Sequence, residues 1–328
     1  MPWDAIGSSP LMTAIEPPLC GVLLLDKPLG LSSSQATQRV RRLLGGVKAG
    51  HVGTLDPLAT GMLPICLGEA TKVAGEIVDS RKQYSFRIAL GQKTTTGDRE
   101  GQVVEESAVP SACAMTLAAV LESFIGESQQ IPPMYSALKH HGQPLYKLAR
   151  AGVSVERAAR SVRISSLIGI WVDSHAIDCQ LVCSKGTYVR VLAEDLAHRV
   201  GTCGHVVELR RDWVEPFEGA EMMSFDQLTT RLQDPQPLCL LPPDRALPWL
   251  PTVQLNETQA CRLRQGQRIH WPSAITGEVE STTTLRVYDE SGVFVGLAIP
   301  DGPDGLRAKR LMAGPIGQIA LEAPPPSE

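Results

Sequence analysis

A single aspartate in a glycine-bounded stretch is the residue of this chain best suited to do chemistry. Asp56 stands before Pro57, with Gly53 and Gly61 on either side, in the sequence GHVGTLDPLATG at 50–61. Pro57 biases the preceding residue towards extended backbone and the glycines permit tight turns, so backbone restriction should hold the carboxylate. A lone, positioned carboxylate suits nucleophilic or base chemistry. An ordinary Asp-Pro turn fits the same pattern.

The residues before this stretch predict a strand and a helix that would hold it. Residues 21–25 form a short apolar strand, and Ser32 with Gln35 three positions later has the pattern of a capping box. The helix that starts there is predicted to run to Gly45. Apolar residues recur at helical spacing through it, at Ala36, Val40, Leu43 and Leu44. Its arginines are predicted to face largely outward: Arg39, Arg41 and Arg42.

Alternating strands and a second helix follow. Residues 84–90 alternate apolar and polar side chains, which is typical of a half-buried strand, and a turn-rich segment follows at 91–101. Residues 177–183 alternate in the same way. Residues 205–211 are also strand-like. Between residues 183 and 205, apolar residues at helical spacing predict a helix. They are Val189, Leu192, Ala193, Leu196 and Val200. Tyr188 and Arg190 are expected in its first turn.

Composition bounds the class of protein. The chain has 328 residues, 43% hydrophobic and 20% charged, which is enough for a sizeable core and predicts two domains. No run of about 18 apolar residues predicts a transmembrane helix. The first 20 residues lack the basic start and apolar core of a secretory signal, so the cytoplasm is the expected location.

The cysteines and the missing motifs argue against bound cofactors. None of the eight cysteines forms a C-x-x-C pair, and Cys179 and Cys183 fall in an alternating apolar pattern, so all are expected to be reduced. Cys203 and His205 have no second pair at zinc spacing, and we expect no metal site. No phosphate-binding glycine loop of the nucleotide-binding kind is found either.

The distribution of charge is more informative than its sum. The net charge of -4 argues mildly against nucleic acid as a partner. However, no acid lies between Asp26 and Asp56, or between Glu127 and Glu156. The cations of these two windows are Lys27, Arg39, Arg41, Arg42 and Lys48, then Lys139, Lys147 and Arg150. Solvated faces unconnected with RNA would look the same, but two such windows flanking the Asp56 stretch favour an RNA partner.

Four co-ordered motifs resemble the bacterial TruB family of tRNA pseudouridine-55 synthases. They are LLLDKPLGLSS at 23–33, the stretch at 50–61, Tyr84, and SKGTYVR at 184–190. The resemblance runs from about Gly21 to Arg211 and continues more weakly to about Met312. It implies isomerisation of a uridine in the T loop of tRNA to pseudouridine. Because that reaction gains and loses nothing, it implies no cofactor and no metal.

The resemblance also implies roles for individual residues. Asp56 would be the nucleophile, through attack on C1′, addition to the uracil ring or elimination, and Arg190 would pair with it. Tyr84, expected on a strand edge, would stack on the flipped base, although a core tyrosine fits as well. The residues expected to bind substrate beside it are His51, in the space that the base leaves, Tyr188 and Leu209 at the base pocket, and Lys27. Arg190 paired with Glu194 on an exposed helix face remains an alternative.

The implied fold class is α+β, a pseudouridine synthase fold with a mixed, largely antiparallel sheet, flanking helices and a small β-rich PUA-like C-terminal domain. The expected divisions are a loose tail at 1–18, a catalytic domain at 19–234 with a thumb-like insertion at about 124–152, a Pro-rich linker at 235–251, a PUA-like RNA-binding domain at 252–316 and a tail at 317–328. The last domain is predicted to hold a helix at 256–265 and strands at 285–288 and 293–298. The expected partner is the T arm of tRNA, bound by a monomer that needs neither a protein partner nor a membrane.

Three other functions are compatible with parts of this sequence. An RNA-binding or tRNA-folding module with secondary catalysis would keep the same motifs. A guide-dependent synthase subunit is less favoured, because the thumb-like insertion and compact C-terminal domain suit a stand-alone enzyme. An aspartate-nucleophile hydrolase is disfavoured, since no water-activating acid or metal set accompanies Asp56.

Overall fold

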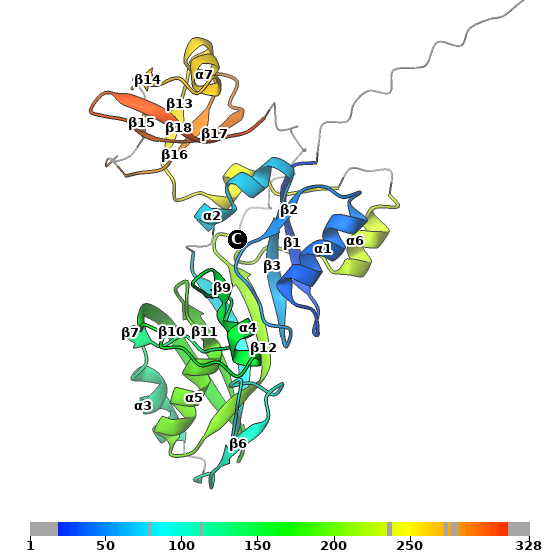
Figure 1. Ribbon diagram of the computed structural model, residues 1–328, viewed down its shortest axis with the longest axis vertical. Helices are drawn as coiled ribbons and strands as arrows, with labels where there is room; N and C mark the ends of the chain where they lie inside the picture. Colours follow the sequence, from blue (N-terminus) through cyan, green and yellow to red (C-terminus); the bar gives the residue numbers. More distant parts are fainter. Residues whose placement is uncertain are drawn as a thin grey trace, which may run out of the picture.

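The computed structural model describes residues 19–77, 80–111, 114–234, 238–271, 275–276, 280 and 282–313. The two expected tails, 1–18 and 317–328, lie outside the described residues. In Figure 1 the molecule is elongated, with a small C-terminal domain at the top and a long sheet with flanking helices below it. No helix among the described residues is long and apolar enough to cross a membrane.

The main sheet has eight strands in the order β1-β3-β12-β4-β11-β10-β7, with β2 paired to β3. Only the pairing of β12 with β3 is parallel, so the sheet is mixed and largely antiparallel, as the fold class requires. Its strands are β1 (Gly21–Lys27), β2 (Ala49–His51), β3 (Ala59–Leu67), β4 (Lys82–Leu90), β7 (Gly126–Gln130), β10 (Arg160–Asp173), β11 (Ala176–Cys183) and β12 (Gly204–Val214). Strand β4 therefore lies in the middle of the sheet.

Helices cover one face of this sheet. They are α1 (Ser33–Leu43), α3 (Ala114–Glu122), α5 (Val189–Val200) and α6 (Phe225–Arg231). Their apolar residues pack on inward-facing side chains of β4 such as Phe86 and Ile88. The capping box predicted at Ser32 and Gln35 is present, and α1 ends at Leu43, two residues before the predicted end.

The other face is covered only in part. Val22 and Leu24 of β1 pack there with Met62 of β3, the 3-10 helix η1 (Gly68–Lys72) and helix α2 (Ala74–Ile77). Phe294, Leu297 and Met312 of the C-terminal domain join this second core. The C-terminal domain is therefore packed against the β1–β3 end of the main sheet.

Described residues of the segment expected as a Pro-rich linker pack against the main sheet. Leu240 is buried in the first core and Leu247 in the second. Leu241 exchanges two backbone hydrogen bonds with Val22, of 2.8 and 3.0 Å, and the 3-10 helix η2 (Pro243–Ala246) follows. This proline-rich segment is thus irregular but packed along the sheet. Prolines disfavour regular helices and central strands, but they do not prevent the residues between them from being buried.

The C-terminal domain contains a six-stranded sheet in the order β14-β18-β17-β16-β13-β15. Its elements are β13 (Thr252–Gln254), α7 (Glu257–Arg264), β14 (Ile269–His270), β15 (Ile275–Thr276), β16 (Leu285–Tyr288), β17 (Phe294–Pro300) and β18 (Gly305–Leu311). The predicted helix and strands at 256–265, 285–288 and 293–298 are confirmed to within two residues. Lys72 Nζ donates to Leu311 O at 2.7 Å, which ties this domain to η1. Its PUA-like RNA-binding character stays a prediction.

Two small hairpins border the site described below. The first is formed by β5 (Gln92–Thr94), within the segment predicted to be turn-rich, and β6 (Val103–Glu106), just after it. The second is formed by β8 (Lys139–His140) and β9 (Gln143–Pro144) and leads into α4 (Leu145–Arg150). The second hairpin and α4 fall within residues 124–152, the segment predicted to be a thumb-like insertion.

Candidate active site

The loop that carries Asp56 connects β2 to β3 and is fixed by hydrogen bonds from the start of α1. The Ser33 hydroxyl donates to Leu55 O at 3.0 Å and accepts from Leu55 N at 2.7 Å. Gly30 N donates to Pro57 O at 2.8 Å. The residues before and after Asp56 are therefore anchored, and the carboxylate is held in place by backbone contacts, as the sequence predicted.

Glycines shape this loop at two positions where a side chain would not fit. Gly53 has φ +69° and Gly61 has φ +95°. A Cβ at Gly61 would lie 2.2 Å from the carbonyl oxygen of Arg211, and a Cβ at Gly53 would lie 3.0 Å from Arg211 Nη1. The left-handed backbone and the close approach of β12 both demand glycine at position 61.

Asp56 forms an ion pair with Arg190 of α5. The distance from Arg190 Nη2 to Asp56 Oδ2 is 2.8 Å, and the side chains are 5% and 35% exposed. Burial raises the pKa of the Asp56 carboxyl, while the Arg190 guanidinium and Lys27 act to lower it. The expected pair is thus present. The alternative partner, Glu194, instead contacts Lys93 at 3.2 Å.

A second carboxylate on the same arginine was missed from the sequence. Asp98 Oδ2 lies 3.6 Å from Arg190 Nη1, and its side chain is only 5% exposed. Thr96 Oγ1 and Glu100 N both donate to Asp98 Oδ1, at 2.6 and 3.0 Å. Arg190 also donates to the carbonyl of Thr96 at 2.7 Å. The sequence showed only a turn-rich segment here, because nothing local indicates that the turn folds back onto α5.

Lys27 is buried within electrostatic range of the Asp56 carboxylate. Its side chain, expected among the cations of the basic window, is completely inaccessible. Nζ donates to Pro28 O at 2.9 Å and to Leu31 O at 2.6 Å. Burial lowers the pKa of Lys27 to about 8, against the opposing effect of Asp56. Lys27 therefore does not belong to the exposed basic surface. Its charge instead helps to lower the pKa of the Asp56 carboxyl.

Tyr84 lies in the centre of the sheet and not on a strand edge. Strand β4 pairs with β12 on one side and β11 on the other, and Tyr84 is 9% exposed. Burial raises the pKa of the Tyr84 phenol, and the Arg211 guanidinium acts to lower it. The hydroxyl interacts with Arg211 and lies within electrostatic range of Asp56. Tyr84 is also part of the first hydrophobic core, which fits the alternative of a core tyrosine.

Comparison with known proteins assigns this chain to a family. Residues 41–189 match the family described as "TruB family pseudouridylate synthase (N terminal domain)", residues 190–247 match "tRNA pseudouridylate synthase B C-terminal domain", and residues 251–312 match "Pseudouridine synthase II TruB, C-terminal". The tRNA pseudouridine synthase B of Chromohalobacter salexigens is 44% identical over 280 residues, which are 85% of this chain and 90% of that protein. That of Cupriavidus metallidurans is 45% identical over 297 residues, 89% and 94% of the two chains. This chain belongs to the TruB family. Its members are pseudouridine synthases, and the protein is accordingly an isomerase.

Solved structures agree with the TruB-family fold. A crystal structure of a Cbf5–Nop10–Gar1 complex contains a chain that is 22% identical, with a TM-score of 0.68 over 85% of this chain and 78% of that one. An H/ACA RNP bound to a substrate RNA containing 2′-deoxyuridine gives 19% identity and a TM-score of 0.69, over 90% and 85%. At these identities the likeness shows the fold alone.

The remaining predicted residues of this TruB-family site lie around Asp56 at different distances. Tyr188 is the N-cap of α5, not a first-turn residue, and its N–H donates to Gln130 Oε1 at 2.9 Å. Burial raises the pKa of the Tyr188 phenol, which is also within electrostatic range of Asp56. Tyr188 and Tyr84 thus lie within electrostatic range of Asp56, whereas Arg190 contacts it directly.

His51 and Leu209 border this group. His51, on β2, has Nδ1 3.1 Å from the hydroxyl of Thr37 on α1. Burial lowers the pKa of His51, and the Arg211 guanidinium lowers it further. Leu209 is 8% exposed and stands opposite Phe86 of β4 and Ala59 of β3.

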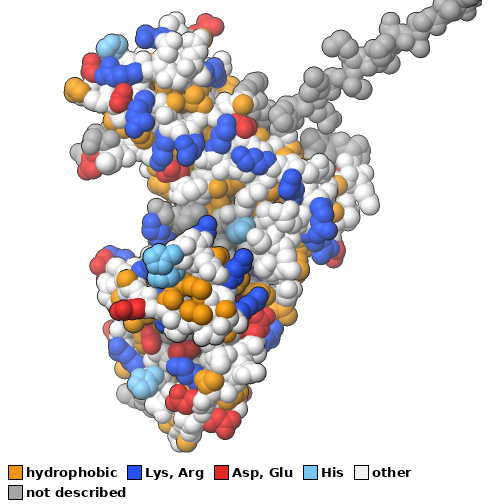
Figure 2. Space-filling view, in the orientation of Figure 1, with side chains coloured by type: hydrophobic (Ala, Val, Ile, Leu, Met, Phe, Trp, Pro, Cys, Tyr) orange, Lys and Arg blue, Asp and Glu red, His pale blue; other side chains and the backbone are white. Residues whose placement is uncertain are grey.

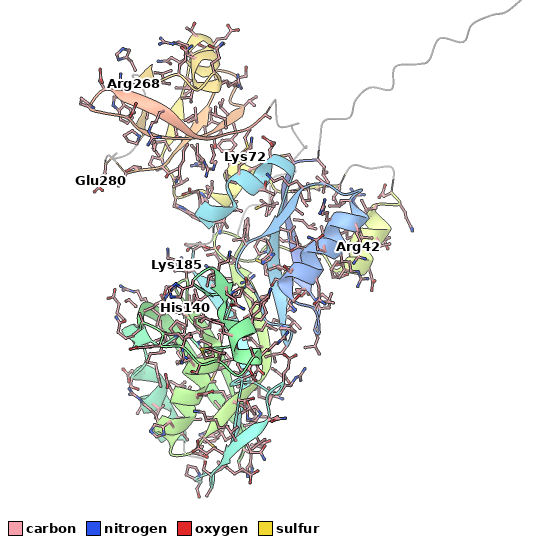
Figure 3. All side chains as sticks on the ribbon, viewed as in Figure 1. Arg42, Lys72, His140, Lys185, Arg268 and Glu280 are labelled. Carbon is pink, nitrogen blue, oxygen red and sulfur yellow. The ribbon has the colours of Figure 1, made fainter. Side chains whose placement is uncertain are left out.

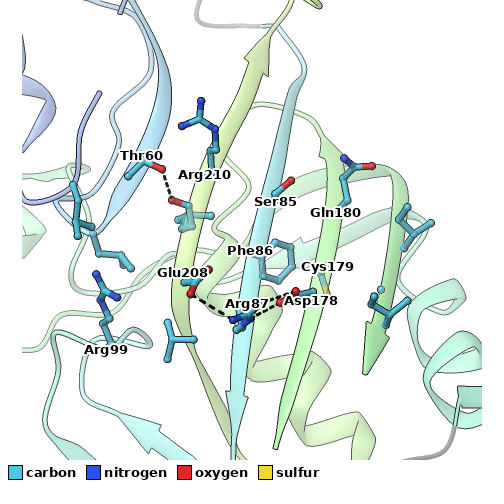
Figure 4. A pocket seen from close by; sticks show the side chains of 17 residues that line it. Thr60, Ser85, Phe86, Arg87, Arg99, Asp178, Cys179, Gln180, Glu208 and Arg210 are labelled. Atoms are coloured by element: carbon cyan, nitrogen blue, oxygen red, sulfur yellow. Dashed lines mark hydrogen bonds and ion pairs between the residues drawn. The ribbon is translucent and has the colours of Figure 1, made fainter. Parts of the chain in front are cut away.

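A cavity of about 840 Å³ lies on the other face of the sheet in this TruB-family enzyme (Figure 4). Arg87 lies in it and contacts Asp178 at 2.6 Å and Glu208 at 3.5 Å. Arg87 alternates with Tyr84 and Phe86 along β4, so this cavity opens away from Asp56. Among the described residues, no group of three or more His, Cys, Asp or Glu side chains is placed to hold a metal ion.

Proposed function

We propose that this TruB-family isomerase converts the uridine at position 55 in the T loop of tRNA to pseudouridine, with Asp56 as the nucleophile. The observation that carries the proposal is the partly exposed carboxylate of Asp56. Asp56 lies on a loop that is anchored at both sides, and the buried Arg190 of α5 pairs with its carboxylate. The curated relatives of similar sequence are named tRNA pseudouridine synthase B. We extend their substrate to this chain.

In this reaction the bond from C1′ to N1 of uracil breaks and a bond from C1′ to C5 forms. The electron pair of the broken bond stays on the uracil, and the C5 hydrogen is finally replaced by one on N1, so no atom is gained or lost overall. A carboxylate held ionised by Arg190 is a suitable nucleophile or base for this exchange. Burial opposes ionisation of Asp56 and leaves its pKa raised, and the Arg190 and Lys27 charges offset part of that effect.

The reacting uridine must leave its stack, which costs a few kcal/mol. Contact with an aromatic side chain is worth about 1–3 kcal/mol per base and offsets much of that cost. We assign this contact to Tyr84, with Tyr188 and Leu209 at the border of the base pocket. His51, half-buried beside α1, takes the space that the base leaves in the RNA.

We infer that RNA enters by displacing the thumb-like segment. Arg190 Nη2 donates to the carbonyl of Tyr135 at 2.8 Å, so this segment lies on the Asp56 site in the protein alone. Lys139, Lys147 and Arg150 are exposed on it. Once RNA has displaced this segment from Arg190, its exposed cations are suited to bind RNA phosphates.

Basic side chains continue along the same side of the molecule. Figure 2 shows Lys and Arg side chains on both borders of a recess between the C-terminal domain and the lower part of the main sheet. In Figure 3, Lys185 and His140 lie beside this recess and Lys72 lies near the C-terminal domain, whereas Arg42 of α1 lies on the opposite side of the view. We propose that a monomer recognises the T arm here mainly by shape and phosphate contacts.

Mapping the modified position tests this proposal. A tRNA transcript without modifications, incubated with the enzyme, should acquire pseudouridine at position 55, and a transcript with cytidine there should acquire none. An isolated T-arm stem-loop should also be modified, since the recognition surface is assigned to that arm. Modification at another position, or of uridine 55 only within a protein complex or with a guide RNA, would contradict the proposal.

A further inference from the structure

Arg211 is a buried cation without a carboxylate partner. Its side chain is 1% exposed, in the middle of β12 between β3 and β4. Buried arginines are rare and are usually paired with an acid. Within the described part of the chain, no carboxylate lies at ion-pair distance from Arg211. Its charge is therefore uncompensated in a region that water does not reach.

Backbone carbonyls of the Asp56 loop and of β3 accept its hydrogen bonds. Arg211 Nε donates to Met62 O at 2.7 Å, and Nη2 donates to Gly53 O at 3.1 Å. Gly53 is the residue whose missing side chain makes room for the guanidinium. Arg211 thereby holds the turn that leads into Asp56.

The same guanidinium reaches the Tyr84 hydroxyl. Tyr84 and Arg211 are directly opposite each other in the pairing of β4 with β12. Directly opposite residues project to the same face of a sheet, so these two buried side chains are neighbours, and the Arg211 guanidinium interacts electrostatically with the Tyr84 hydroxyl. One buried cation thus connects the loop of the proposed nucleophile to the tyrosine beside it.

We propose that Arg211 is a positioning residue for the isomerisation, acting through the hydroxyl of Tyr84. By donating to the phenol oxygen it orients and polarises the O–H group towards the uracil. When the bond from C1′ to N1 breaks, its electron pair leaves negative charge on the uracil until the bond from C1′ to C5 forms. A polarised, preorganised donor stabilises such charge, because it needs no reorientation during the reaction. This inference rests on the proposed placement of the base at Tyr84.

A double-mutant cycle with Tyr84→Phe tests the coupling. The rate constant for isomerisation of bound T-arm RNA is measured for the wild type, Tyr84→Phe, Arg211→Lys, Arg211→Gln and the two double variants. Removing one preorganised donor typically costs about 100- to 1,000-fold in rate. We expect Arg211→Gln to lower the rate by about 10- to 100-fold, and Arg211→Lys, which keeps a cation, to lower it less. In the Tyr84→Phe background, both substitutions should lower the rate by a clearly smaller factor, because the hydroxyl is gone and only the hold of Arg211 on the Asp56 loop remains to be lost.

RNA affinity and thermal melting of each variant separate this role from a merely structural one. We expect the affinity to change by less than about 3-fold, and Arg211→Lys carries the test if Arg211→Gln does not fold. If the Arg211 substitutions lower the rate equally with and without the Tyr84 hydroxyl, the inference is wrong while the proposed function stands. If Tyr84→Phe isomerises normally, the role of the hydroxyl is wrong, and the inference falls with it. If the wild type does not isomerise T-arm RNA, the proposed function itself is overturned.

Discussion

Asp56 and Asp98 pair with the two terminal nitrogens of one buried guanidinium, that of Arg190. Nη2 lies 2.8 Å from Asp56 Oδ2, and Nη1 lies 3.6 Å from Asp98 Oδ2. The two acids differ in exposure, since the Asp98 side chain is 5% exposed and that of Asp56 is 35% exposed. Asp98 is further fixed by hydrogen bonds from Thr96 and Glu100, whereas no such donor besides Arg190 is found for Asp56 among the described residues. One acid therefore anchors the arginine, and the other is presented to a substrate.

Asp98→Asn should lower the rate of isomerisation by about 10- to 100-fold with little change in RNA affinity. The substitution removes the negative charge that pairs with Arg190 Nη1 and fixes the guanidinium. Buried charge pairs couple by several kcal/mol at most, which sets the upper limit of the loss. Single-turnover rates and filter binding measure the two effects. Asp178→Asn is the matched control, because Asp178 pairs with Arg87 on the other face of the sheet. Equal rates for Asp98→Asn and the control would contradict the anchoring role.

Asp56→Asn should be at least as stable as the wild type at neutral pH. Burial raises the pKa of the Asp56 carboxyl above its ordinary value. Between the ordinary pKa and the raised one, the folded state binds more protons than the unfolded state, so stability falls as pH rises through that window. An uncharged amide avoids this loss. Thermal melting at neutral pH measures it, and a clearly lower melting temperature for Asp56→Asn would show that the ionised carboxylate stabilises the fold.

The same raised pKa predicts how activity depends on pH. If the ionised carboxylate is the reactive form, the rate should begin to fall at a higher pH than the ordinary range of aspartate, as acid is added. Single-turnover rates across mildly acidic pH measure this limb. Melting curves at each pH serve as the control for unfolding. A rate that stays constant down to the ordinary pKa of aspartate would mean that the Asp56 carboxyl is not raised in the complex with RNA.

Gly61→Ala should destabilise the fold by more than about 2 kcal/mol. Its Cβ would meet the Arg211 carbonyl oxygen at 2.2 Å, in addition to the backbone strain of a φ of +95°. Gly46→Ala is the control, because Gly46 has φ +88° and nothing lies within 4 Å of a Cβ there. Urea denaturation should show the smaller loss for Gly46→Ala. Similar losses for both would mean that strain alone, without the contact between β3 and β12, explains the glycine.

RNA binding should protect the thumb-like segment from trypsin. Lys139, Lys147 and Arg150 are exposed in the protein alone and are proposed to lie against phosphates in the complex. Limited proteolysis with and without T-arm RNA, followed by mass spectrometry, gives the cleavage sites. Cleavage at Arg262 of α7, which is exposed on the C-terminal domain, provides a comparison within the same molecule. Unchanged cleavage of the thumb-like segment under saturating RNA would contradict its proposed role.

Local patterns were sufficient for part of this structure. The capping box at Ser32, the alternating strand around Tyr84 and the glycine-bounded turn at Asp56 depend on neighbouring residues, and the sequence predicted them. The hydrogen bonds that anchor this turn to Ser33 and Gly30 join more distant residues and were not predicted. The pairing of Arg190 with Asp56 came from the resemblance to the TruB family. These features cover the centre of the site and part of the main sheet, whereas strands β2, β3, β7 and β10 were not predicted.

Other features depend on contacts between distant segments and could not be predicted in this way. Arg211 is 149 residues from Met62, its carbonyl acceptor, and no local signal distinguishes it from an exposed arginine. Asp98 has a role only because its turn folds back onto α5. Lys27 follows an apolar strand in a basic window, and only the packing of the Asp56 loop shows that it is buried. The central position of β4 likewise follows from pairing with β11 and β12.

The central claim is that Asp56 performs the isomerisation, and tritium release tests it most directly. T-arm RNA carrying 5-tritiated uridine at position 55 is incubated with the wild type and with Asp56→Asn, and RNA binding is measured for both. We predict release by the wild type and none above background by Asp56→Asn, with similar affinities. Release by Asp56→Asn at a rate near that of the wild type would contradict the assignment of the nucleophile. Absence of release by both, with binding intact, would make this protein an RNA-binding or RNA-folding module.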